Sequence, residues 1–332
     1  MNLLIFTQKV DKEDDNLGFF HRWLEELAER ADKVFVVANF IGKYSLPANV
    51  QVFSLGKEKK IGRIMRYINF YKYLFSALPK ADAVFVHMIQ IWVILAWPAA
   101  AIFKKKIYLW YTHKSVTSSL RLAEKLVAKI FTASPESCRL RSKKIMVTGH
   151  GIDTERFKPK NMLKTGALKL LSVGRITPSK DYEFILEVVS LASGNAVLDI
   201  VGEPITKADV TYKRKLEMLV LEKNLRGRVI FLGAKNQDEM QDIYNSHDIL
   251  LHASETGSMD KVVLEAMSCG LPIITTSEAF KSLLAVLPKD AAVIAGKIVQ
   301  TAGAGKNLAL RELVIKNHNL ENLIETIIAN MR

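Results

Sequence analysis

The chain has 332 residues, 49% of them hydrophobic, which excludes a disordered protein and is enough for two ordinary domains, each with its own core. Its formal net charge of +13 is uneven, because residues 1–157 carry 25 Lys+Arg against 14 Asp+Glu, and residues 158–332 carry 22 against 20. A cationic first half favours an anionic partner, which leaves nucleic acid, an anionic membrane surface and an anionic substrate open.

The two cysteines, Cys138 and Cys269, form no spacing motif and lie in apolar or helical contexts. Disulfides are therefore not implied, and a reducing cytoplasm is favoured. Met1 is followed at once by a strand-like stretch, without a basic leader or a small-residue cleavage site, so we expect no signal peptide.

The first elements predicted are a strand at residues 3–7, an amphipathic helix at 19–30 and a strand at 34–38. Gly18 stands where the intervening loop meets the helix, and there it could let the backbone approach a phosphate at the helix N-terminus. A glycine required only by the turn is an equal alternative.

Residues 57–80 predict a basic amphipathic helix. Its apolar stripe at helical spacing consists of Ile64, Ile68, Tyr71, Phe75 and Leu78. Its cations are Lys57, Lys59, Lys60, Arg63, Arg66 and Lys72. Such a helix can lie in a membrane interface, and it can equally pack on its own sheet with solvated lysines.

Residues 83–103 carry no formal charge, so they are long enough to be considered as a membrane span. His87, Gln90 and Pro98 interrupt the stretch, which divides more naturally into a strand at 83–88 and a helix at 91–103. Trp92 and Trp97 of that helix would suit an interfacial position.

A strand predicted at residues 105–113 ends at His113, and His87 ends the preceding strand in a comparable way. Polar side chains at the carboxyl ends of parallel strands face the crevice in which open α/β sheets bind ligands. His113 is therefore the first candidate for a functional histidine and His87 the second, with a structural role open for both.

After a linker near residues 152–166, strands and helices alternate, which predicts a doubly wound parallel sheet. The expected strands span 168–175, 196–202, 228–233, 249–254 and 272–276. The expected helices span 181–192, 208–223, 237–246 and 260–269. The AGAGKN stretch at 302–307 lacks the spacing of a phosphate loop and is interpreted as a turn at a helix boundary.

The stretch from Asp260 to Thr276 and the turn from Ser172 to Lys180 are expected to meet in space. Glu265 lies within an otherwise apolar helix, where an unpaired carboxylate would cost several kcal/mol, so we expect it to bind something. Gly174, Arg175 and Lys180 follow a predicted strand, and two cations at such a strand end suit an anionic ligand.

Five strings of the second half occur in order and resemble the consecutive motifs of the family 4 retaining glycosyltransferases, which have the GT-B fold. They are SVGRITPSKDYEFILEV, GIDTERF, LDIVGE, RVIFLGAKNQDEMQDIYNSHDILLHAS and KVVLEAMSCGLPIITT. The resemblance covers most of residues 144–276. It implies two Rossmann-like domains facing a cleft, and metal-independent transfer of a sugar from a nucleoside diphosphate, UDP or GDP, to a glycan or lipid-linked acceptor of cell-envelope polysaccharides.

The same resemblance implies roles for individual residues. Arg175 and Lys180 would hold the diphosphate, Glu265 the ribose, and His113 would approach the reacting sugar, with no metal or cofactor needed. The implied donor-binding set is Gly18, Gly174, Gly257, Ser258, Asp260, Lys261 and Val262.

Position 257 departs from the family pattern, which usually has a glutamate eight residues before the equivalent of Glu265. Here that residue is Gly257, and the flanking acids are Glu255 and Asp260. We expect Asp260, or backbone amides of residues 257–261, to replace the missing contact to the donor sugar.

The expected architecture is therefore an acceptor-side domain at residues 1–157, a sugar-nucleotide-binding domain at 158–317, and a helix at 318–332 that packs back on the first domain. The protein is expected in the cytoplasm, with peripheral binding to the inner membrane face open. Two alternatives remain: another sugar-nucleotide reaction such as epimerisation, and a catalytically inactive module that binds nucleotide sugars or nucleic acid.

Overall fold

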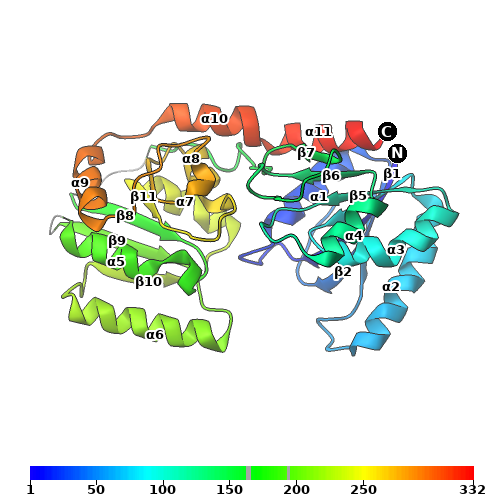
Figure 1. Ribbon diagram of the computed structural model, residues 1–332, viewed down its shortest axis with the longest axis horizontal. Helices are drawn as coiled ribbons and strands as arrows, with labels where there is room; N and C mark the ends of the chain where they lie inside the picture. The colour runs from blue at the N-terminus through cyan, green and yellow to red at the C-terminus, as the bar shows by residue number, and fades with distance from the viewer. Residues whose placement is uncertain (162–165, 193–194) are drawn as a thin grey trace. The chain divides into compact units, whose positions relative to one another are not determined.

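The computed structural model describes residues 1–161, 166–192 and 195–332 and divides the chain into two units (Figure 1). The first unit consists of Met1–Gly151 and His318–Arg332, and the second of Ile152–Asn317. The sequence placed the boundary after residue 157, but Ile152 and Phe157 are buried in a core of the second unit. The division therefore lies earlier, and residues 162–165 of the expected linker are outside the described residues.

Among the described residues, the first unit has a seven-stranded parallel sheet in the order β3-β2-β1-β4-β5-β6-β7. Its strands are β1 (Asn2–Val10), β2 (Lys33–Ile41), β3 (Val50–Ser54), β4 (Ala83–His87), β5 (Lys106–Trp110), β6 (Lys129–Thr132) and β7 (Ile145–Val147). Its helices are α1 (Phe19–Arg30), α2 (Arg63–Ala77), the 3₁₀ helix η1 (Leu78–Lys80), α3 (Gln90–Ile102), α4 (Ser118–Leu126) and α11 (Leu320–Met331).

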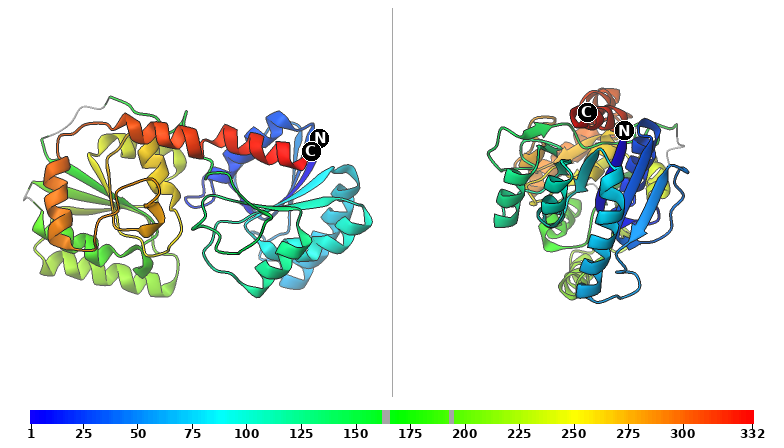
Figure 2. Two further views of the ribbon diagram at one scale, coloured as in Figure 1. Left: turned by 45° about the horizontal axis from the view of Figure 1, so that its top comes forward. Right: turned by 90° about the vertical axis from the view of Figure 1, so that its right-hand side faces the viewer.

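Both faces of this sheet are buried, which is why residues 3–6 of β1 are a continuous apolar run. Leu4 and Phe6 pack with α2, α3 and α4 on one face. Leu3 and Ile5 pack with α1 and α11 on the other. Helix α11 begins at its N-cap Asn319 and completes that second face, so both chain termini lie in the first unit (Figure 2).

Helix α2 packs on its own sheet, which is one of the two alternatives left open for it, but not through the apolar stripe that the sequence singled out. The side chains of Ile64, Ile68, Tyr71 and Phe75 are exposed, and Leu78 alone of the predicted stripe is buried. The helix packs on the sheet through a different stripe, Phe70, Leu74 and Ala77, which also has helical spacing.

The second unit has, within the described ranges, a five-stranded parallel sheet in the order β10-β9-β8-β11-β12. Its strands are β8 (Leu168–Val173), β9 (Ala196–Val201), β10 (Val229–Gly233), β11 (Ile249–His252) and β12 (Ile273–Thr275). Its helices are η2 (Pro178–Lys180), α5 (Tyr182–Leu191), α6 (Lys207–Glu222), α7 (Gln237–Ser246), α8 (Lys261–Ser268), η3 (Glu278–Phe280), α9 (Ala291–Thr301) and α10 (Leu308–His318). The predicted alternation is thus confirmed, and residues 302–307 form the turn between α9 and α10 as expected.

The uncharged stretch at residues 83–103 contains β4 and the whole of α3, as its division into a strand and a helix predicted. Across the described ranges, no helix combines the length and the apolar character that crossing a membrane requires. Both cysteines are buried and free.

Candidate functional site

The second sheet changes direction between β8 and β11, which are neighbours in space although β9 and β10 lie between them in the chain. Ligands of open α/β sheets bind outside the carboxyl ends of the strands at such a point. Every site residue predicted for the second half lies on the segments that follow these two strands.

The turn after β8 is fixed by close packing around the carbonyl oxygen of Gly174. The hydroxyl of Tyr182 donates to that oxygen at 2.6 Å. A Cβ atom on Gly202 would lie 2.0 Å from the same oxygen, so no larger residue fits there without a backbone shift. Burial raises the pKa of Tyr182, which keeps the phenol protonated as a donor. The backbone of this turn is therefore positioned by contacts within the protein.

Lys180 is held at this turn by an acid from the other strand end. Its Nζ lies 2.6 Å from Oδ2 of Asp260 and 3.4 Å from Oγ of Ser254. Nε2 of His252 lies 2.8 Å from the same Asp260 oxygen. Burial alone would raise the pKa of Asp260, but the hydrogen bond with His252 and the charge of Lys180 outweigh it and lower that pKa. Asp260 is thus a carboxylate at neutral pH.

Glu265 is buried, with 1% of its surface exposed, and two donors satisfy it. The hydroxyl of Tyr244 donates to Oε2 at 2.9 Å, and Nζ of Lys261 donates to Oε1 at 3.1 Å. Burial lowers the pKa of Lys261, and Glu265 opposes that shift. The acid that the sequence singled out therefore has partners within the protein, and each of its oxygens keeps a further acceptor position.

Because Asp260 and Lys261 are adjacent, the Lys180–Asp260 pair and the Lys261–Glu265 pair lie next to each other on one segment. Lys180 and Glu265 therefore belong to two ion pairs that are joined only by the backbone between Asp260 and Lys261. Arg175 is exposed and forms no hydrogen bond or ion pair within the described part of the chain, so only one of the two predicted cations is held in place.

The loop before α8 distinguishes the two acids that flank Gly257. Glu255 is bound at the surface by Lys289 at 2.7 Å, and Lys289 also pairs with Asp181 at 2.6 Å. Asp260, by contrast, belongs to the network with Lys180. Gly257 itself has a φ of +66°, which favours glycine over glutamate at that position.

The first sheet changes direction between β1 and β4, and His87 lies at that point. Its Nδ1 is 3.1 Å from the hydroxyl of Thr7, and its ring stacks on Phe20 at a centroid distance of 4.0 Å. Burial lowers the pKa of His87 to about 3, so the ring is neutral at physiological pH.

His113 lies elsewhere than the sequence suggested. Strand β5 ends at Trp110, and Tyr111 makes the last backbone hydrogen bond to β6 before the chain leaves the sheet. His113 is exposed in the following loop, where its Nδ1 accepts a hydrogen bond from the amide of Ser115 at 3.1 Å. The prediction that it ends the strand is wrong.

Gly18 closes the loop between β1 and α1. Its amide donates to the carbonyl oxygen of Asp14 at 3.0 Å, and a Cβ atom would lie 2.4 Å from that oxygen. The turn therefore requires glycine here, whether or not a ligand binds.

Sequence reasoning missed His252, Ser254 and Tyr244. His252 ends β11, so the rule applied to His87 and His113 would have found it. Tyr244 lies on α7, 21 residues before Glu265, and no spacing rule connects the two.

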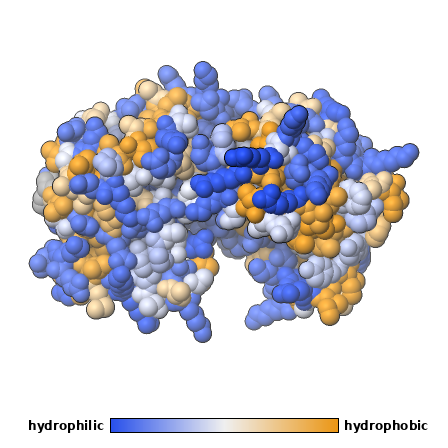
Figure 3. All heavy atoms as spheres, viewed as in Figure 1, coloured by the Kyte–Doolittle hydropathy of each residue, from blue (hydrophilic) through white to orange (hydrophobic). Residues whose placement is uncertain are grey.

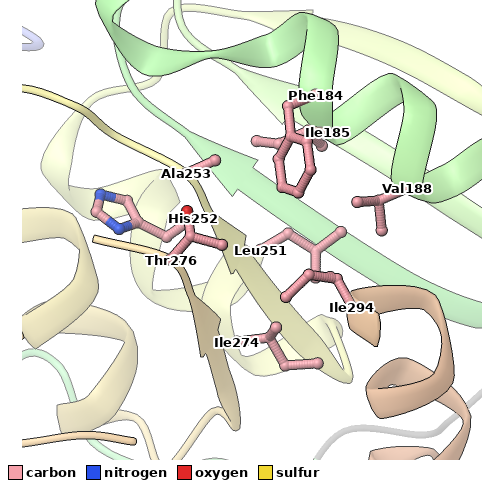
Figure 4. A pocket seen from close by; sticks show the side chains of 9 residues that line it. All are labelled: Phe184, Ile185, Val188, Leu251, His252, Ala253, Ile274, Thr276 and Ile294. Atoms are coloured by element: carbon pink, nitrogen blue, oxygen red, sulfur yellow. The ribbon is translucent and has the colours of Figure 1, made fainter. Parts of the chain in front are cut away.

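An apolar pocket lies beside the network, between α5, α9 and the ends of β11 and β12 (Figure 4). Its lining residues are Phe184, Ile185, Val188, Leu251, His252, Ala253, Ile274, Thr276 and Ile294. The ring of His252 points away from the apolar side chains, toward Asp260. His252 thus connects the pocket to the charged groups, and neither Lys180 nor Asp260 lines it.

Comparison with known proteins gives a family match for the second unit. Residues 153–282 match the family model described as Glycosyl transferases group 1. An uncharacterized glycosyltransferase of Methanocaldococcus jannaschii is 33% identical over 110 residues, which are 32% of this chain and 27% of that protein. The UDP-Gal:alpha-D-GlcNAc-diphosphoundecaprenol alpha-1,3-galactosyltransferase of Escherichia coli is 30% identical over 149 residues, which are 40% of this chain and 37% of that protein. The chain thus covers well under half of the length of these relatives.

The whole chain has a counterpart among solved structures. Anabaena HepE in complex with UDP-glucose superposes with a TM-score of 0.76 at 15% identity, covering 100% of this chain and 99% of that one. The fold is therefore that of the GT-B glycosyltransferases, with two Rossmann-like parallel-sheet domains, as the sequence predicted.

Proposed function

We propose that the protein is a glycosyltransferase that moves a sugar from a nucleoside diphosphate, UDP or GDP, to a glycan or lipid-linked acceptor. The observation that carries this proposal is two ion pairs, Lys180–Asp260 and Lys261–Glu265, on the segments that follow the switch-point strands of the second sheet. Both pairs lie within the residues that match Glycosyl transferases group 1.

Lys180 is the group best placed to bind the diphosphate. Its ammonium has three N–H donors, of which Asp260 and Ser254 take two, so one remains for a phosphate oxygen. Arg175 is exposed on the segment between β8 and Lys180, and we assign it a second contact to the diphosphate. Because Asp260 offsets the charge of Lys180, the donor has to share Lys180 with that acid.

Glu265 would accept hydrogen bonds from the ribose hydroxyls through the acceptor positions that Tyr244 and Lys261 leave open. Helix α8 begins beyond Asp260 without a side-chain cap, and helix N-termini of this kind bind phosphate or sugar oxygens. We assign the residues from Gly257 to Val262 to this part of the donor. Asp260 would replace the carboxylate missing at position 257.

The proposed reaction proceeds with retention and without a metal ion. The bond between the anomeric carbon and the diphosphate oxygen breaks, and the acceptor oxygen bonds to that carbon on the same face. The acceptor proton moves to the leaving phosphate oxygen, and Lys180 and Arg175 stabilise the charge on the diphosphate. His113 would approach the reacting sugar from the first unit.

The acceptor is assigned to the first unit, whose cationic character suits an anionic or lipid-linked molecule. The Escherichia coli relative is named for a diphosphoundecaprenol-linked acceptor. We propose a location in the cytoplasm, at the inner face of the membrane, and a role in cell-envelope polysaccharide synthesis.

The test is to identify a donor by thermal shift against a panel of sugar nucleotides, and then to compare Lys180→Ala with Lys297→Ala. Losing one fixed contact to the leaving group lowers kcat by about 10²–10³-fold. Lys297 is an exposed lysine of α9, and its replacement should leave turnover unchanged. Unchanged turnover of Lys180→Ala would refute the placement of the diphosphate.

Two further measurements test the reaction type. Turnover should persist in a chelator, and strict dependence on Mg²⁺ or Mn²⁺ would contradict the metal-free reaction. A product formed from the donor without any acceptor would indicate another sugar-nucleotide reaction instead.

A further inference from the structure

Helix α2 has two apolar faces, and only one of them packs on the protein. Phe70, Leu74 and Ala77 are buried against the first sheet. The opposite stripe is exposed, with relative exposures of 79% for Ile64, 53% for Ile68 and 53% for Phe75. A stripe of this size on a surface helix indicates a binding surface rather than scattered exposed residues.

Helix α3 extends this surface. The two helices cover the same face of the first sheet and meet where Phe70 stacks on Trp92 at 4.8 Å. On the outer side of α3, Trp97 is 42% exposed and Ile102 is 77% exposed. The exposed apolar residues of the two helices are here called the α2–α3 face: Ile64, Ile68, Tyr71, Phe75, Trp97 and Ile102. Hydrophobic residues gather in this region in Figure 3, and α2 lies foremost in the right view of Figure 2.

Lysines flank the α2–α3 face at both ends. Lys57, Lys59 and Lys60 lie in the loop directly before α2, and residues 104–106 directly after α3 are all lysine. Between residues 57 and 106 the chain has ten Lys+Arg against two Asp+Glu. None of these six lysines is in a salt bridge within the described part of the chain.

We propose that the α2–α3 face binds the surface of an anionic lipid bilayer, with its apolar side chains among the acyl chains and the flanking lysines at the headgroups. Apolar residues with cationic neighbours are what an interfacial helix requires, and anionic lipids attract clustered lysines. This binding does not depend on the proposed glycosyl transfer. Nucleic acid would match the lysines but not the apolar stripe between them.

Trp97 provides an intrinsic probe for the test. The chain has four tryptophans, and Trp23, Trp92 and Trp110 are buried. The protein is mixed with vesicles of phosphatidylcholine alone or with an equal part of anionic phosphatidylglycerol, followed by sedimentation and tryptophan emission. We expect sedimentation and a blue-shifted emission with the anionic vesicles. Added salt should weaken both, because it screens the lysines.

Two variants assign the binding to the surface. Replacing Ile68 and Phe75 together by glutamine should weaken vesicle binding by at least about tenfold, because both side chains leave water on binding. The matched control replaces Val293 and Val299 by glutamine, since these α9 residues are 44% and 59% exposed in the second unit. Trp97→Phe should keep sedimentation and lose the blue shift.

Several results would overturn the proposal. Equal binding of the Ile68/Phe75 variant and the original protein, or equal affinity for neutral vesicles, would each do so. A dimer that forms without lipid and is lost in that variant would assign the α2–α3 face to a second copy. Salt-sensitive binding to duplex DNA, with no binding to vesicles, would assign the lysines to nucleic acid.

Discussion

The two units place polar groups at the same point of their sheets but in different chemical states. In the first, His87 lies at the switch between β1 and β4 as a neutral ring among aromatic side chains. In the second, Lys180, Asp260 and Glu265 lie at the switch between β8 and β11 as paired charges. The topology thus fixes where a site lies, and the local charges decide which ligand it suits.

The units can be followed separately, because all four tryptophans belong to the first unit. Tryptophan emission therefore reports unfolding of that unit alone, whereas far-ultraviolet circular dichroism reports both. Each prediction below uses this difference.

The largest effect is expected from Asp260→Asn. The change leaves Lys180 without its acid and removes the carboxylate that faces His252, and breaking a buried ion pair from one side costs about 3 kcal/mol. Urea unfolding followed by circular dichroism should show the loss, while the tryptophan transition stays in place.

Asp242→Asn is the matched control, since Asp242 is 63% exposed and pairs with Lys160 at the surface of the same unit. Surface pairs contribute about 0.5 kcal/mol. If both variants were equally stable, the Asp260 network would be no more than a surface contact.

Mild acid should destabilise the first unit before the second. Burial lowers the pKa of His87 to about 3 and that of His318 to about 4, against 6.5 for histidine in an unfolded chain. Below pH 6.5 the unfolded chain binds protons that the folded unit does not. The free energy of unfolding therefore decreases as the pH is lowered, by about 1 kcal/mol for each histidine at pH 5.5. The pKa of Asp260 is lowered, so its contribution is lost only below about pH 3.9.

The measurement is the urea midpoint of tryptophan emission at pH 7 and pH 5.5. In the original protein the amide of His150 donates to Nδ1 of His318 at 3.2 Å. His318→Asn keeps an acceptor for this amide and removes one titrating ring. The variant should show about half of the pH effect. If this variant lost as much stability between pH 7 and pH 5.5 as the original protein, groups other than His318 would be responsible for the loss.

Two matched deletions of a hydroxyl compare the charged site with the neutral one. Tyr244→Phe removes a hydrogen bond to a carboxylate and should cost about 2 kcal/mol, whereas Thr7→Val removes a bond to a neutral ring and should cost about 1 kcal/mol. Circular dichroism should detect the first and tryptophan emission the second. The reverse order would contradict the assignment of charged and neutral states. In assays with the donor, Tyr244→Phe should also raise KM.

Much of the second unit could be predicted, because strict alternation of apolar strands and amphipathic helices leaves little freedom in a parallel sheet. Strand bounds agree within two residues. Lys180 pairs with Asp260 and Glu265 with Lys261, so the expected meeting of Lys180 and Glu265 stays a prediction. A carboxylate inside an apolar helix is a strong signal by itself. Its partner Tyr244 could not be predicted, because the contact depends on how α7 and α8 pack.

The first unit was harder to predict from the sequence, for two physical reasons. Helix α2 has two apolar stripes at helical spacing, and a sequence does not say which of them a sheet covers. Apolar residues continue past Trp110 to Tyr111, so hydropathy alone did not reveal that β5 ends before His113. The five motif strings did not help here, because they cover the second half.

Helix α11 covers one face of the first sheet, so the core of the first unit is complete only when this last helix has been synthesised. Residues 1–151 leave the ribosome long before it. Ile152–Asn317, one continuous stretch, can mature earlier in synthesis. Until Leu323 and Ile327 emerge, the nascent first unit keeps an open apolar flank, and chaperones that bind such surfaces have their longest access there.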